Sequence, residues 1–209
     1  MRLPGMLLPV LVLGFGALGL AVYKAGTRGE GPLASWVGPQ AGSEVQTLLP
    51  RIHEVPDFKL VESDGSPFSL ARLKGKVWIA SFLFTHCAST CPAMALKIQM
   101  LQTALPEGVL IVSFSADPVR DTPEVLTKWG EFQNRKKERW LLGTGEWDEI
   151  SRLAEKGFYL GGKEPLLHSS RFALVDQHGN LRGYYDSQNE AEMTKLISDV
   201  SFLLYESQG

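Results

Sequence analysis

The chain has 209 residues, of which 44% are hydrophobic, so it is long enough for one well-packed domain. Its 21 basic and 23 acidic residues leave a net charge of -2 and no basic stripe for a phosphate backbone, which argues against nucleic acid as a partner. With only 2 cysteines, it is not a disulfide-stapled scaffold.

An uncharged apolar segment lies near the N-terminus, at residues 6–23. A helix over this segment would be roughly 27 Å long, nearly the thickness of a hydrocarbon core. No clean signal-peptidase site follows it, so we expect an uncleaved transmembrane anchor over residues 1–24 rather than a removed signal. The charges that flank the segment are balanced and do not set its orientation.

Residues 25–50 are rich in Gly, Pro, Ser and Ala without periodicity, which is typical of a flexible linker. The folded domain is therefore expected over residues 51–209.

The domain begins with strand patterns. Residues 57–63 and 67–70 flank Asp64-Gly65, a hairpin turn signal, and residues 76–84 form a continuous apolar run typical of a buried central strand. A helix is predicted from Pro92, with apolar residues on one face.

Strands and helices then alternate, which favours a largely parallel sheet. We predict a strand at 109–117, a helix capped by Thr122 with Pro123 in its first position, a strand at 139–143 and a helix at 146–156.

The chain ends with a hairpin and a helix. Residues 171–176 and 181–186 are predicted to pair across a turn, and Ser187 with Glu190 forms a capping box for the last helix. This order of elements predicts an α/β, thioredoxin-like fold, a central mixed sheet with flanking helices.

Both cysteines lie where the apolar strand gives way to the next helix. Backbone N–H groups and the helix dipole stabilise a thiolate at such a position. Because proline disfavours a helix interior, Pro92 places Cys91 at the cap and Cys87 in the preceding loop. A buried cysteine is also an ordinary apolar residue, but two at this one junction favour a chemical role.

The spacing of Cys87 and Cys91 leaves two uses open. Their sulfurs can converge on one metal ion or close into a small disulfide. The loop is one residue wider than the C-x-x-C of disulfide oxidoreductases, so spacing alone does not separate a metal site from a redox pair.

Three stretches resemble the Sco family of copper proteins in cytochrome oxidase assembly. They are FTHCASTCP at 84–92, SADPVRDTPEVL at 115–126 and HSSRFALVDQHGNL at 168–181. The resemblance runs from about Val55 to the end of the chain.

The family motif is C-x-x-x-C-P with a distant histidine, and it falls on Cys87, Cys91, Pro92 and His168. The resemblance thus implies Cys87, Cys91 and His168 as ligands of copper, as Cu(I), Cu(II) or both. Soft thiolates suit Cu(I), imidazole also serves Cu(II), and zinc more often recruits a fourth protein ligand. From the residues alone, His168 is a polar loop residue.

Two positions depart from the family pattern. Ala88 stands where a proline commonly follows the first cysteine, and Leu167 stands where an acidic residue often precedes the histidine. The loop is therefore expected to be softer, and the imidazole to lack a carboxylate partner.

The other polar residues near the motifs have ordinary explanations. Asp117, Arg120 and Asp121 match the family's D-P-x-R-D-T loop, and we assign them mainly to a strand end and a helix start, with support of the ligands as the alternative. The other histidines, His53, His86 and His178, are interpreted as structural or solvated.

The resemblance implies a membrane-tethered protein that delivers copper to the dinuclear copper centre of a respiratory cytochrome c oxidase. Its partner would be the copper-accepting subunit of that oxidase. The domain would lie in the periplasm, on the bacterial inner membrane, with the mitochondrial inner membrane as the alternative.

The alternative function is a thiol–disulfide oxidoreductase, in which Cys87 attacks and Cys91 resolves. Its substrate would be the cysteines of an oxidase subunit or of another extracytoplasmic partner. A peroxidase is less favoured, because Thr85 is present but the proline-led approach typical of peroxiredoxins is missing.

Overall fold

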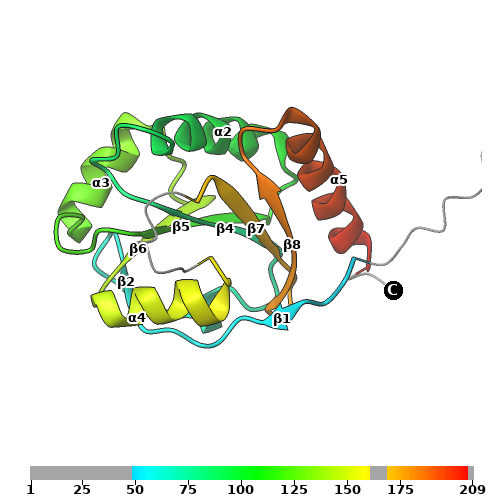
Figure 1. Ribbon diagram of the computed structural model, residues 1–209, viewed down its shortest axis with the longest axis horizontal. Coiled ribbons are helices and arrows are strands. Elements are labelled where there is room, and N and C mark those ends of the chain that lie inside the picture. The colour runs from blue at the N-terminus through cyan, green and yellow to red at the C-terminus, as the bar shows by residue number, and fades with distance from the viewer. Residues whose placement is uncertain (1–48, 161–168, 207–209) are drawn as a thin grey trace, which may run out of the picture. The chain divides into compact units, whose positions relative to one another are not determined.

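The computed structural model describes residues 49–160 and 169–206 (Figure 1). In this part of the chain one eight-stranded sheet has the order β1-β8-β7-β4-β5-β6-β2-β3. Its strands are β1 (His53–Glu54), β2 (Leu60–Glu62), β3 (Pro67–Phe68), β4 (Trp78–Leu83), β5 (Leu110–Ser115), β6 (Trp140–Thr144), β7 (Arg171–Val175) and β8 (Asn180–Asp186).

Strand β4 lies at the centre of the sheet, and all of its residues are buried. It pairs in parallel with β5, with Ser81 opposite Ser113, and antiparallel with β7, with Ala80 opposite Ala173. The buried central strand predicted over residues 76–84 is therefore confirmed, and so is the mixed sheet.

Helices cover both faces of the sheet. Figure 1 shows α2, α3 and α5 on one side and α4 on the other. The helices are α2 (Cys91–Ala104), α3 (Pro123–Phe132), α4 (Trp147–Arg152), which continues into a π-helical turn (Leu153–Gly157), and α5 (Glu190–Glu206); a short 3-10 turn (Leu70–Arg72) precedes β4.

Each face of the sheet has its own hydrophobic cluster. Ile98 of α2, Leu126 of α3 and Leu196 of α5 are fully buried in one cluster. Ile150 of α4 packs in the other cluster with Phe114 of β5. The cluster on the first face holds α2 against the sheet, and this fixes the position of its first residue, Cys91.

The predicted hairpins are both present. β2 and β3 pair across a turn in which Gly65 adopts a positive φ of 84°, a conformation that glycine accepts without strain. β7 and β8 form the C-terminal hairpin. Strand β1, which pairs with β8 at the edge of the sheet, was not predicted, because two residues carry no recognisable period.

Helix α2 begins at Cys91, one residue earlier than predicted. Thr90 is its N-cap residue and makes no side-chain cap bond, and Pro92 occupies the second helical position. Cys91 therefore lies in the first turn instead of at the cap.

The capping box predicted from Ser187 and Glu190 is wrong. Asn189 caps α5, since its Oδ1 accepts from the N–H groups of Ala191 at 3.0 Å and Glu192 at 3.3 Å. A turn closed by Asp186, whose carboxylate accepts from the Gln188 N–H at 3.0 Å, delays the start of the helix.

The predicted transmembrane helix over residues 1–24 lies outside the described residues, and so does the linker over residues 25–50 except for its last two residues. Among residues 49–160 and 169–206, no helix has both the length and the apolar character needed to cross a bilayer.

A buried ion pair joins three parts of the domain. The Arg182 guanidinium lies 2.9 Å from the Asp176 carboxylate, and their side chains are 2% and 0% exposed. Arg182 also donates to the Leu49 carbonyl at 2.7 Å and to the Glu206 carboxylate at 3.0 Å. It thereby ties the C-terminal hairpin to the start of the domain and to the end of α5.

We predict that Arg182→Met lowers the free energy of unfolding by about 3 kcal/mol, because it leaves Asp176 buried without its cation. Urea denaturation measures the change. The control Arg152→Met breaks the partly exposed pair with Glu149 and is expected to cost less than about 1 kcal/mol. Equal losses of unfolding free energy in the two variants would contradict the claim that burial makes the Arg182–Asp176 pair the more important one.

Candidate metal centre

Residues 84–90, here called the cysteine loop, join the end of β4 to the start of α2; Cys87 lies within this loop, and Cys91 is the first residue of α2. The Cys87 N–H donates to the Phe84 carbonyl at 3.3 Å, so the chain turns as soon as it leaves the sheet. Because β4 and β5 are parallel, the loop lies at the edge where both strands end, the usual place for sites in α/β proteins.

The structure brings the Cys87 and Cys91 thiols together, and both are free. Cys91 is buried, with 4% of its surface exposed, whereas Cys87 is only partly buried. The Cys87 Sγ lies 3.5 Å from the Ser89 Oγ. Of the two cysteines, Cys87 is therefore the one that solvent can reach.

The two thiols have opposite acidities. Burial alone would raise the pKa of Cys87, but hydrogen bonds from Cys91 and Ser89 outweigh it and lower the pKa to about 6. Burial raises the pKa of Cys91 to about 12, and its hydrogen bond to Cys87 adds to this effect. At neutral pH the pair therefore holds a Cys87 thiolate and a Cys91 thiol that donates to it.

His168 lies outside the described residues. Within residues 49–160 and 169–206, no three His, Cys, Asp or Glu side chains are grouped so that they could hold a metal ion. The described part of the site thus consists of the two sulfurs.

The other histidines fit the structural or solvated roles expected of them. His86 is exposed, and its Nδ1 lies 2.9 Å from the Thr85 Oγ1. His53 and His178 line a cleft of about 540 Å³ away from the cysteines, where the His53 ring packs against Tyr159 with 5.1 Å between centroids.

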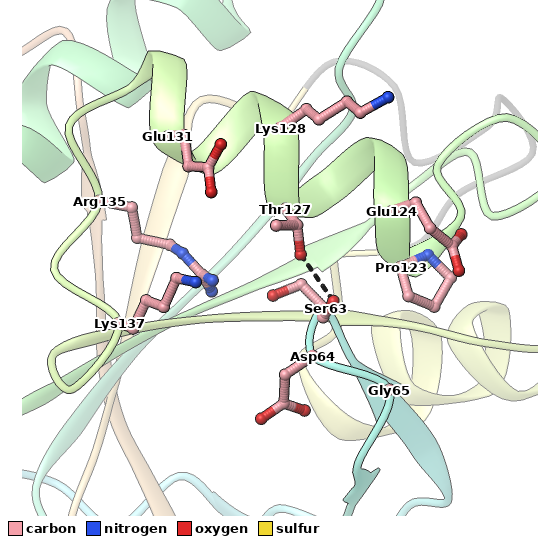
Figure 2. A pocket seen from close by; sticks show the side chains of 10 residues that line it. All are labelled: Ser63, Asp64, Gly65, Pro123, Glu124, Thr127, Lys128, Glu131, Arg135 and Lys137. Atoms are coloured by element: carbon pink, nitrogen blue, oxygen red, sulfur yellow. Dashed lines mark hydrogen bonds between the residues drawn. The ribbon is translucent and has the colours of Figure 1, made fainter.

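A second cleft, of about 560 Å³, lies between α3 and the turn that joins β2 to β3. Figure 2 shows its lining, in which the Thr127 hydroxyl donates to the Ser63 carbonyl at 2.7 Å. Arg135 lines it as well, but its guanidinium is engaged by the buried Glu62 carboxylate at 3.0 Å. This lining contains neither cysteine nor histidine, so the cleft is separate from the thiol pair.

The loop after β5 has the roles expected of it, with one addition. Asp117 pairs with Arg120 at 2.7 Å, and the Thr122 Oγ1 caps α3 by accepting from the Val125 N–H at 3.4 Å. Asp121, in contrast, is buried and reaches back to Thr85 in the cysteine loop. No local sequence pattern predicts this contact beyond the motif itself.

We predict that Cys91→Ala raises the pKa of Cys87 from about 6 towards that of an ordinary thiol, because the variant loses the hydrogen bond that stabilises the thiolate. The ultraviolet absorbance of the thiolate, followed against pH, reports the shift. Ser89→Ala should move the pKa less and in the same direction, and the distant Ser201→Ala should leave it in place. An unchanged pKa in Cys91→Ala would show that the thiol pair is not coupled.

Known proteins are similar to this chain in sequence and in fold. A curated relative, the SCO1 protein homolog of Bacillus subtilis, is 35% identical over 160 residues, which cover 72% of this chain and 83% of the relative. A relative from Stutzerimonas stutzeri, provisionally named as copper-binding, is 32% identical and is matched over 66% of this chain and 71% of its own.

The solved structure of BsSco matches with a TM-score of 0.66 and 34% identity, over 72% of this chain and 93% of its own. BsSco is described as a member of the Sco family of cytochrome c oxidase assembly proteins, with a disulfide switch. This likeness confirms the predicted thioredoxin-like architecture of the described part of the chain.

The model of the SCO1/SenC family matches residues 47–202, a span that contains the cysteine loop and every element of the sheet. The match thus extends well beyond the short motifs and covers nearly the whole domain, and this chain belongs to the SCO1/SenC family.

Proposed function

We propose that this protein binds copper and delivers it to the dinuclear copper centre of a respiratory cytochrome c oxidase. The observation that carries the proposal is the pair of free cysteines at the end of the central strand, of which Cys87 is partly exposed and Cys91 is buried; the lowered pKa of Cys87 and the raised pKa of Cys91 agree with it. Membership of the SCO1/SenC family, the name of the S. stutzeri relative and the description of BsSco support it.

The proposed ligands are Cys87, Cys91 and His168. Two sulfurs form a soft donor set that favours Cu(I), and an imidazole nitrogen extends it to Cu(II). Since the Cys91 thiol is protonated without metal, copper has to displace its proton, and the bond to copper replaces the hydrogen bond between the thiols. The accessible Cys87 sulfur would be the one that the acceptor approaches during ligand exchange.

The proposed setting is extracytoplasmic. Residues 1–24 would anchor the chain in the membrane, residues 25–50 would act as a flexible linker, and residues 51–209 would form the copper-binding domain. The bacterial inner membrane is favoured, with the domain in the periplasm, and the mitochondrial inner membrane is the alternative. A tether would keep the domain close to the copper-accepting subunit of a membrane-bound oxidase.

Titration of the reduced full chain with Cu(I), against a competing chelator, tests the ligand set. Removal of a ligand should cost more than removal of a residue that only supports one, so each of Cys87→Ala, Cys91→Ala and His168→Ala should weaken binding by more than about 100-fold. The control His178→Ala removes a histidine from the separate cleft and should leave the affinity unchanged. Wild-type affinity in His168→Ala would remove that residue from the site.

A second candidate function is thiol–disulfide exchange, which the opposite acidities of the two thiols favour. The Cys87 thiolate would attack a partner disulfide and form a mixed disulfide, and Cys91 would then lose its proton and attack Cys87. The partner would leave with both sulfurs reduced, and the Cys87–Cys91 pair would carry the oxidation. The disulfide switch named for BsSco is consistent with such a reaction.

Turnover on a model disulfide, with and without copper, separates the two functions. If copper delivery is the main role, metal-free turnover should be slow, and oxidation of the Cys87–Cys91 pair should abolish Cu(I) binding because it consumes both thiolates. Fast metal-free turnover that persists in His168→Ala would instead make the oxidoreductase the main function.

A further inference from the structure

A buried carboxylate holds the cysteine loop from behind. Asp121 is 0% exposed, and its Oδ2 accepts from the Thr85 N–H at 3.1 Å and from the Ser115 hydroxyl at 2.7 Å. Its Oδ1 accepts from the Thr85 hydroxyl at 2.5 Å. The bonds to Thr85 fix both the backbone and the side chain of a residue that lies two positions before Cys87.

The same carboxylate joins the ends of the two parallel strands. Ser115 is the last residue of β5, and its hydroxyl also accepts from the Asp117 N–H at 3.1 Å. Thr85 follows the end of β4. Asp121 therefore fixes the exit of the chain from β4 relative to the neighbouring strand, at the point where the cysteine loop begins.

The bond from Thr85 to Asp121 also determines which atom donates in the hydrogen bond between Thr85 and His86. A hydroxyl has one hydrogen, and the Thr85 hydroxyl gives it to Asp121. At its contact of 2.9 Å with the His86 ring, the Thr85 oxygen can then only accept, so His86 Nδ1 must carry a hydrogen. In neutral His86 the lone pair is thereby left on Nε2, in the exposed ring next to Cys87.

Packing alone does not explain Asp121. None of the ion pairs in residues 49–160 and 169–206 includes it, so its carboxylate is held by neutral donors. An apolar side chain could fill the same space without the cost of burying a polar group. We therefore assign the structural role of Asp121 to the hydrogen bonds that it makes to the cysteine loop and to β5.

We propose that Asp121 is a positioning residue for the thiol pair, which acts through a hydrogen-bond relay from its carboxylate to the Thr85 hydroxyl and on to the His86 ring. The relay holds the cysteine loop in the conformation that brings Cys87 near Cys91. Its effect on copper rests on the proposed function, whereas its effect on His86 does not.

The first test is the tautomer of His86 in the reduced, metal-free full chain. The chain has 4 histidines, so nitrogen-15 NMR of histidine-labelled protein gives a simple spectrum, in which His86→Gln identifies the signal of His86. We expect the hydrogen of neutral His86 on Nδ1 in the wild type and in Thr85→Ser, which keeps the hydroxyl. Thr85→Val and Asp121→Asn should lose this preference. A wild-type hydrogen on Nε2, or an unchanged tautomer in Thr85→Val, would overturn the relay.

The second test is Cu(I) affinity in the same variants. Asp121→Asn and Thr85→Val should bind about tenfold more weakly, the loss typical of residues that orient metal ligands, and Thr85→Ser should match the wild type. The matched control is Arg182→Met, which disturbs a buried ion pair away from the loop and should keep both the affinity and the tautomer.

The possible results separate the two proposals. Unchanged affinity in Asp121→Asn and Thr85→Val would overturn the positioning role, and so would an equal loss in Arg182→Met. If the wild type bound no copper, the proposed function would be wrong. The NMR measurement of the His86 tautomer would then test the hydrogen-bond relay independently of copper.

Discussion

The site depends on the position of one strand. β4 is held between β5 and β7, with both faces of the sheet covered, so its register is fixed from two sides. The residue that follows it, Phe84, is the first of the cysteine loop, and Cys91 begins the helix that packs back on the sheet. The two sulfurs therefore meet because a rigid strand and a packed helix hold the two ends of a short loop.

Within that frame the two thiols differ because their surroundings differ. Cys91 is buried among the apolar residues that anchor α2, which raises its pKa, whereas Cys87 is only partly buried and its pKa is lowered by hydrogen bonds. A single negative charge shared in this way suits a soft metal ion and also suits nucleophilic attack. The two uses would exclude each other, because a disulfide would consume both of the sulfurs proposed as copper ligands.

Local patterns predicted the parts of the fold that are regular. The apolar run of β4, the Thr122 cap of α3 and the hairpin turn at Gly65 were all recognised, because each depends on residues close in sequence. The cap of α5 was misplaced, since a turn at Asp186 competes with the capping signal at Ser187.

The site was predictable to a different degree. The cysteines could be found from their spacing and their place between strand and helix. His168 was proposed as a ligand only from the family resemblance, because it is distant in sequence from both cysteines and no local pattern joins it to them. The role of Asp121 could not be predicted from a local pattern, since it lies 36 positions from Thr85 and the two meet only when β4 and β5 pair.

X-ray absorption spectroscopy of the full chain loaded with Cu(I) counts the atoms bound to copper and identifies their elements, so it tests the proposed ligand set. We expect two sulfur ligands and one nitrogen ligand, with the nitrogen lost in His168→Ala and one sulfur lost in Cys87→Ala. A copper environment without sulfur, or one that stays the same in Cys87→Ala, would contradict this ligand set.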